Sequence, residues 1–297
     1  MKNKHLLKGY IFVILSAIIF GLMPLMAKFI YAEGVNSITL VFLRNIISVP
    51  ILAFLAFRTE GSIKIEAKDF PKISFIAIMG CCITPLLLFS SYNYIPSGTA
   101  TVFHFIYPAI VVLGEFVILK NQIKYGHIIS VIICLTGIAL FYNPSSKINP
   151  EGSFYALLSG ITYAAYVVSL SASKYRKMSV FTFSFFVAVI CSFVMLGVCI
   201  MTKQLSLPNT VSGWLLIILF AVSLNIGAVV LFQKGTFLIG GSRASILSTF
   251  EPITSILAGA IIFKEELSLF TVIGTILVIT ASFLIAILDI RNSNITK

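Results

Sequence analysis

Ten apolar segments of about twenty residues recur along the chain, and this repetition limits the possible folds more than any other feature. A helix of about 20 residues crosses a hydrocarbon core of about 30 Å, and it pairs its own backbone polar groups while doing so. The sequence therefore predicts an all-α polytopic membrane protein with ten transmembrane helices. We expect these at residues 9–31, 37–57, 72–92, 96–119, 125–143, 152–173, 179–201, 212–234, 241–263 and 269–289.

Composition agrees with a membrane protein. Hydrophobic residues make up 59% of the chain and charged residues 10%, whereas about 25% of residues are charged in soluble domains. The net charge of +11 does not indicate nucleic acid, because Lys and Arg lie in short loops instead of clustering on one water-facing surface. All five cysteines fall in apolar segments without metal-ligand spacing, so we interpret them as small core residues and expect no metal site.

The distribution of positive charge predicts the orientation. With the N-terminus in the cytoplasm, the even-numbered loops and both tails hold 16 of the 21 Lys and Arg residues, as the positive-inside rule requires. These 16 are Lys2, Lys4, Lys8, Arg58, Lys64, Lys68, Lys72, Lys120, Lys124, Lys174, Arg176, Lys177, Lys234, Arg243, Arg291 and Lys297. We therefore expect a multi-pass protein of the cell (plasma) membrane with cytoplasmic N- and C-termini.

An internal repeat divides the chain at residues 1–145 and 146–297, with NPSSKINPE at residues 143–151 as the linker. Tyr107-Pro108 matches Glu251-Pro252 at an interval of 144 residues, and GYIFVILSAIIFG from Gly9 aligns with GSFYALLSGITYA from Gly152. Because five crossings per half turn the second copy over, the sequence predicts two inverted five-helix repeats. In secondary transporters built this way, the binding site lies between the halves near the bilayer midplane.

Glu251 is the first candidate for the functional site. It lies near the middle of an apolar segment, where an isolated carboxylate charge costs several kcal/mol unless it has a partner or a role. It could carry a proton or balance a cationic substrate group, or it could be a hydrogen-bonded residue that holds helices together. The adjacent Pro252 removes a backbone donor and is expected to kink the helix.

Other ionisable residues also lie within predicted spans. Arg44 must pair or reach water: a substrate carboxylate or phosphate could satisfy it, and so could a backbone carbonyl or a snorkelled position. His104 could relay protons or could simply be hydrogen-bonded. Glu115 is expected to reach the membrane interface or to pair with Lys120 or Lys124.

Polar and aromatic side chains complete the predicted site. Tyr107, Tyr163 and Tyr166 are candidate cavity walls, although tyrosines at helical spacing are usually packing residues. Asn225 is a further polar group in mid-span. Helix irregularities are expected at Pro24, Pro108 and Pro252, and residues 92–94 are expected in the outer aromatic belt.

Motifs for ATP hydrolysis and metalloenzyme chemistry are missing: the sequence has no GxxxxGK[ST] loop and no HExxH. We therefore expect no enzyme activity and no cofactor, and transport would depend on a gradient. The predicted partners are a small-molecule substrate, the lipid bilayer and protons. No feature of the sequence specifies an oligomeric state.

The combined pattern resembles the EamA group of the drug/metabolite transporter superfamily. The resemblance rests on the two repeats and on ASILSTFEPITSILAGAIIFKEEL, where a central Pro is followed by Glu265. It implies ten helices, cytoplasmic termini, a central cavity and alternating access by rocking of the halves. The first repeat departs from the pattern, with Tyr107 in place of Glu251 and Asn121 or Gln122 in place of the terminal acid. This departure indicates functional asymmetry between the halves.

The sequence thus favours a secondary transporter of a small polar metabolite, such as an amino acid, that works by proton- or gradient-coupled exchange. Export is favoured over uptake. A quaternary-ammonium or other organic-cation transporter is the nearest alternative, since an acid among aromatic rings suits such ligands. A non-transporting receptor or assembly factor with the same fold, and a lipid-carrier flippase, are further alternatives.

Overall fold

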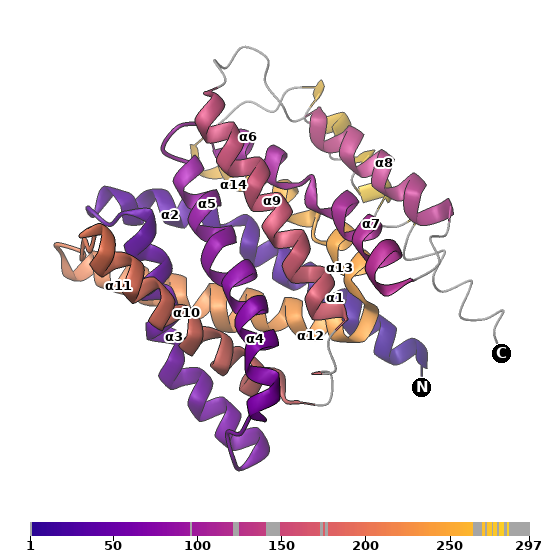
Figure 1. Cartoon of the computed structure of the whole chain (residues 1–297). Coiled ribbons are helices and arrows are strands. Elements are labelled where there is room, and N and C mark those ends of the chain that lie inside the picture. The colour runs from indigo at the N-terminus through magenta and orange to yellow at the C-terminus, as the bar shows by residue number, and fades with distance from the viewer. Residues whose placement is uncertain are drawn as a thin grey trace.

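The computed structural model describes residues 2–95, 97–120, 125–140, 149–172, 175 and 178–263, with short pieces between 269 and 284. Within these residues all regular structure is helical (Figure 1). The elements of the first half are α1 (Lys2–Gly21), α2 (Met23–Ala32), α3 (Ser37–Glu60), η1 (Ala67–Asp69), α4 (Phe70–Ala77), η2 (Ile78–Ile83), α5 (Thr84–Ser91), α6 (Ser97–His104), α7 (Tyr107–Leu119) and α8 (Tyr125–Ala139). Those of the second half are α9 (Pro150–Ser171), α10 (Val180–Thr202), α11 (Val211–Ala221), η4 (Val222–Val229), α12 (Val230–Ile239), α13 (Gly241–Leu247) and α14 (Phe250–Phe263).

Six helical stretches are long and apolar enough to cross a membrane: His5–Ala32, Ser37–Glu60, Ala67–Ser91, Pro150–Ser171, Val180–Thr202 and Val211–Ile239. They correspond to the first, second, third, sixth, seventh and eighth predicted spans, and the eighth runs five residues beyond the predicted end at residue 234. The predicted fourth and ninth spans are each interrupted, giving α6 with α7 and α13 with α14. Much of the tenth span, most of the linker, Asn121, Gln122 and Glu265 lie outside the described residues.

Elements of the second half repeat those of the first at a nearly constant interval. From α3 to α10 the starts differ by 143 residues (37 to 180), and from α6 to α13 by 144 (97 to 241). Even the two π-helical segments, η2 and η4, begin 144 residues apart (78 to 222). A π-helical turn is rare and local, so its recurrence at the same place in each half is a strong structural counterpart of the repeat in the sequence.

Helices of one half pack against helices of the other half, and equivalent pairs form in both directions. The first helix of each half packs against the last part of the third span of the other: α1 on α12, and α9 on α5. Glycines permit both contacts, because a Cβ added at Gly9 would lie 2.4 Å from Ile239 and one at Gly152 would lie 2.6 Å from Tyr94. Consequently the start of each first helix lies beside the end of its partner.

The second helices of the two halves, α3 and α10, pack on each other and run in opposite directions. At the start of α3, the Asn36 side chain donates to the carbonyl of Gln204, beyond the end of α10, at 2.7 Å. At the other end, the Glu60 carboxylate accepts from the backbone N–H of Ser179, at the start of α10, at 2.6 Å. The helix ends therefore fix the antiparallel arrangement.

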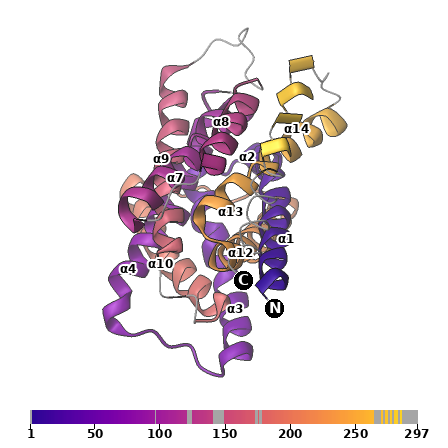
Figure 2. The ribbon, with the colours of Figure 1, turned by 90° about the vertical axis from the view of Figure 1, so that its right-hand side faces the viewer.

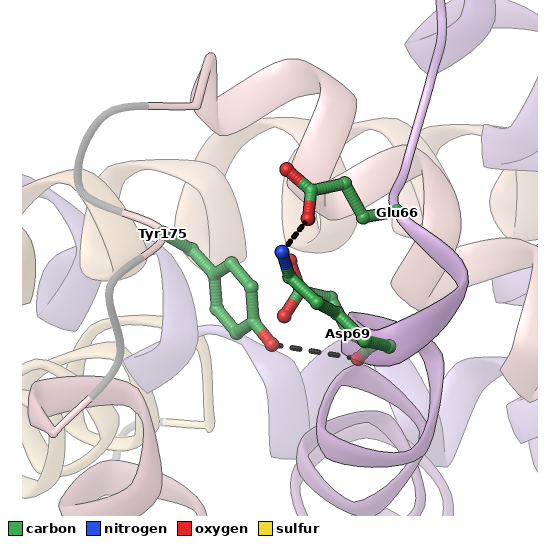
Figure 3. A network of polar contacts seen from close by, with 4 residues as sticks. Glu66, Asp69 and Tyr175 are labelled. Atoms are coloured by element: carbon green, nitrogen blue, oxygen red, sulfur yellow. Dashed lines mark hydrogen bonds and ion pairs between the residues drawn. The ribbon is translucent and has the colours of Figure 1, made fainter.

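The connection from α3 to α4 extends from one end of the helical bundle (Figure 2) and contacts the second half. The Tyr175 hydroxyl donates to the backbone carbonyl of Asp69 at 3.4 Å (Figure 3). Burial and the Asp69 carboxylate raise the pKa of Tyr175, so the phenol stays protonated and can donate. The nearby ion pair between Lys68 and Glu66 is well exposed and adds little stability.

Candidate functional site: a charged cavity between the halves

A cavity lies where helices of both halves meet. It is lined by Phe20, Met23, Arg44, Gly80, Cys81, Thr84, Pro85, Leu88, His104, Tyr163, Tyr166, Val229, Phe232 and Glu251. The space for the centres of water-sized molecules is about 40 Å³. One water needs about 10–15 Å³ by this measure, so the cavity has room for a few waters. A metabolite of several heavy atoms would require the helices to separate.

Two opposite charges line the cavity from different halves. Arg44 on α3 is 3% exposed and Glu251 on α14 is 8% exposed. Both residues are described, yet no ion pair within 4 Å joins them to each other or to another described residue. The Arg44 Nε is buried without a hydrogen-bond partner, and the guanidinium lies 5.8 Å from the centre of the Phe89 ring. Two buried charges that form no ion pair with any described residue mark a place for ligand groups of opposite charge.

Glu251 is positioned by the break between α13 and α14. The chain turns at Ser248 and Thr249, and the Glu251 N–H bonds to the Ser248 carbonyl at 2.9 Å. The phenols of Tyr92, Tyr107 and Tyr163 lie within electrostatic range of the carboxylate. No described residue donates a hydrogen bond to the Glu251 carboxylate.

The prediction that Tyr92 belongs to the outer aromatic belt is wrong. Its hydroxyl is buried, has no hydrogen-bond partner among the described residues and lies within electrostatic range of Glu251. Tyr94, two residues later, is 42% exposed and packs edge-on against Tyr155. Sequence could not separate the two tyrosines, since the assignment depended on which way the turn after α5 faces.

His104 has a defined tautomer. Its Nδ1 lies 2.8 Å from the Ser159 Oγ, and that hydroxyl donates its only proton to the Ala156 carbonyl at 2.6 Å. The Nδ1 must therefore carry the proton and donate to Ser159. In the neutral ring, Nε2 is left as an acceptor on a residue that lines the cavity.

Aromatic rings form one wall of the cavity. Tyr163 and Tyr166 on α9 stack near Phe232 of α12, with ring centres 5.8 and 6.2 Å apart. Tyr107 does not line the cavity with them: it is fully buried behind Tyr163, whose ring centre is 4.7 Å away at a right angle. Two of the three predicted wall tyrosines are thus brought to the cavity.

Asn225 lies in η4, outside the main cavity. Its side-chain amide donates to the Arg44 carbonyl at 3.0 Å and to Asn45 Oδ1 at 3.2 Å, while its own Oδ1 has no partner. It therefore holds the backbone that carries Arg44 and lines a much smaller neighbouring cavity of about 10 Å³.

Prolines stand at the helix interruptions. Pro24 is in the first turn of α2, after the break at Leu22, and Pro108 is in the first turn of α7, after the turn at residues 105–106. Pro252 is the third residue of α14. A first-turn position needs no donor, which explains why proline occurs there.

The expectation for Glu115 is wrong. Glu115 is 7% exposed and accepts hydrogen bonds from the Ser171 hydroxyl, the Gly241 N–H and the Ser242 hydroxyl at 2.6, 2.9 and 2.5 Å. No ion pair joins Glu115 to Lys120, which follows the last residue of α7 in a left-handed conformation (φ 53°). Lys124 lies outside the described residues.

Metal binding finds no support in the described residues, which contain no group of three or more His, Cys, Asp or Glu side chains able to hold an ion. The five cysteines are all buried, as expected for small core residues. Thr84 is a cavity residue that sequence reasoning missed. Its hydroxyl lies 2.7 Å from both the Met79 carbonyl in η2 and the Thr162 hydroxyl.

Comparison with known proteins identifies the family. The model of the EamA-like transporter family matches residues 7–143 and again residues 150–287. The chain belongs to this EamA-like transporter family. It is a multi-pass membrane transporter by family, and its relatives carry names of the same kind.

Several relatives match over nearly the full length. An uncharacterized transporter of Clostridium kluyveri is 21% identical, and the match covers 93% of this chain and 92% of that protein. The uncharacterized inner membrane transporter YicL of Salmonella typhimurium is 26% identical, with 94% and 95% covered. A solved crystal structure shares the fold with a TM-score of 0.76 at 16% identity, covering 98% of this chain and 99% of the other.

Proposed function

We propose that this EamA-like protein is a secondary transporter of a small polar metabolite, such as an amino acid or a related compound, that works by alternating access. The single observation that carries the proposal is the cavity in which Arg44 and Glu251 are both buried and neither forms an ion pair with a described residue. A ligand with one anionic and one cationic group satisfies both charges, and the apolar aromatic wall holds its remainder.

The proposed architecture is ten spans in two inverted repeats, which would allow alternating access. The recurring element order, the exchanged packing partners and the antiparallel α3 and α10 all support it. With a cytoplasmic N-terminus in the cell membrane, rocking of the halves would open the cavity to one side at a time. The small free volume of about 40 Å³ agrees with a closed stage of such a cycle.

The proposed direction of transport is export, driven by exchange with protons or by another gradient. Glu251 is the proposed site of proton or cation binding, because it lies within the bilayer and has no hydrogen-bond donor among the described side chains. His104 Nε2 supplies a second acceptor for a cationic or hydroxyl group of the substrate.

The test is flux of radiolabelled amino acids in proteoliposomes across a pH series, comparing Glu251→Gln with the wild type. We expect the substitution to lower flux by about 10- to 100-fold, as expected for loss of a charge-assisted contact, and to abolish its pH dependence. Wild-type flux with unchanged pH dependence would remove Glu251 from the mechanism.

An organic-cation transporter is the second candidate. Three phenols within electrostatic range of Glu251 favour it, since carboxylates among aromatic rings bind quaternary ammonium groups. Arg44 in the same cavity opposes it. Competition of choline-like cations against amino acids in the same vesicles separates the two, because only an organic-cation transporter would be blocked by choline at comparable concentration.

A further inference from the structure

Glu115 gathers three helical elements from both halves of the chain. The carboxylate is on α7, Ser171 is the last residue of α9, and Gly241 and Ser242 begin α13. All the donors converge on one buried carboxylate, which is the arrangement that best compensates a charge removed from water. We name this set of four residues, Glu115, Ser171, Gly241 and Ser242, the Glu115 clasp.

Glycines make the Glu115 clasp possible. A Cβ added at Gly241 would lie 2.6 Å from Glu115 Oε1, and one at Gly114 would lie 2.9 Å from Val168 of α9. A larger residue at either position would displace the Glu115 carboxylate or the Val168 side chain. The three elements therefore meet closely enough to close the space between them.

Along α9 and along the chain leading to α13, the residues of the Glu115 clasp follow residues that line the cavity. On α9, Ser171 follows the cavity residue Tyr166 by five residues, or about 7 Å of helix. On the chain leading to α13, Gly241 follows the cavity residue Phe232 by nine residues. In the proposed orientation all these ends are cytoplasmic, so the Glu115 clasp stands between the cavity and the cytoplasm.

The opposite end of the molecule has no equivalent carboxylate. The repeat interval of 143 or 144 residues places Ala258 or Gly259 at the position equivalent to Glu115. On the outer side, the half-buried Glu33 accepts from Thr210 and Ser212, and the exposed Glu151 accepts from Tyr155. These hydrogen bonds are exposed to solvent, whereas the carboxylate of the Glu115 clasp is buried. The two ends thus differ in how firmly polar contacts hold them.

We propose that Glu115 is a positioning residue for transport: its hydrogen bonds hold the cytoplasmic end of the pathway closed, and they must break for the cavity to open inward. This inference rests on the proposed function and orientation. The inward-open and outward-open states would then differ in free energy, because the inward-open state is disfavoured until the hydrogen bonds of the Glu115 clasp break.

The test uses Cys81, which lines the cavity, as a reporter. A full-length variant that keeps only this thiol, with Cys82, Cys134, Cys191 and Cys199 replaced by Ala, is labelled with a membrane-impermeant maleimide in inside-out and right-side-out vesicles. In Glu115→Gln we expect labelling from the cytoplasmic side to accelerate about tenfold, the effect of losing about one charged hydrogen bond. Labelling from the outer side should not accelerate.

Glu60→Gln is the matched control. Glu60 also accepts from a backbone N–H and a hydroxyl at a helix start, namely Ser179 and Thr182, but it lies at the exposed end of α3, away from the cavity. Unchanged cytoplasmic labelling in Glu115→Gln, or equal acceleration in Glu60→Gln, would overturn the proposal. If Glu115→Gln does not fold, Ser242→Ala removes one donor and must give a smaller acceleration in the same direction.

Labelling needs no substrate, so this result is independent of the flux assay. Absence of metabolite flux together with accelerated labelling would refute the proposed substrate while supporting the Glu115 clasp. Normal flux with unchanged labelling would refute the Glu115 clasp alone.

Discussion

The two broken helices have the same construction and different chemistry. Each is interrupted by a two-residue turn just before a proline-containing dipeptide, and each break faces a glycine of the other half's first helix. A Cβ at Gly160 would lie 2.5 Å from the His104 carbonyl, and one at Gly21 would lie 2.6 Å from the Glu251 carbonyl. The first break holds the buried phenol of Tyr107, whereas the second holds a carboxylate that lines the cavity. The two breaks thus share a backbone arrangement and differ in the side chain that they place next to the proline.

Exchanging the chemistry of the two breaks tests this difference most strongly. We expect Glu251→Tyr to lower proteoliposome flux by about a hundredfold, because the cavity loses its only carboxylate among the described residues that line it. The double variant with Tyr107→Glu should not recover, since position 107 is fully buried behind Tyr163. Recovery of flux in the double variant would mean that the two breaks are interchangeable.

Enlarging the facing glycines tests the shared construction. Gly21→Ala and Gly160→Ala should each destabilise the protein by about 1–3 kcal/mol, because the added methyl group meets backbone atoms that cannot move away cheaply. Gly197→Ala in α10 is the control: nothing lies within 4 Å of its Cβ position, so helix propensity should stabilise by about 0.5–1 kcal/mol. Thermal unfolding in detergent micelles measures all three, and equal effects at the three positions would contradict close packing at the breaks.

Tyr107→Phe should have the smallest effect. The Tyr107 hydroxyl lies 3.5 Å from the Ser245 carbonyl, at the limit of a hydrogen bond, while its ring contacts remain in phenylalanine. We expect flux within about twofold of the wild type and a stability loss of about 1 kcal/mol or less. A tenfold loss of flux would place the hydroxyl in the transport pathway and make the two breaks chemically more alike.

The sequence by itself determined the membrane class, the repeat and the family. These follow from apolar segments, the Pro108 and Pro252 pattern and local helix chemistry, which need no knowledge of neighbours. It also selected Arg44, His104, Glu251, Tyr163 and Tyr166, because polar groups in apolar segments are costly and therefore conspicuous.

Only the tertiary structure decided which of these groups share a cavity. It placed Tyr107 behind the wall, Asn225 beside the Arg44 backbone and Tyr92 near Glu251. It also turned Glu115 from an expected interfacial residue into the centre of a buried contact among α7, α9 and α13. The physical reason is that the face a helix presents inward, and the donors it meets there, depend on packing between residues more than fifty positions apart in sequence.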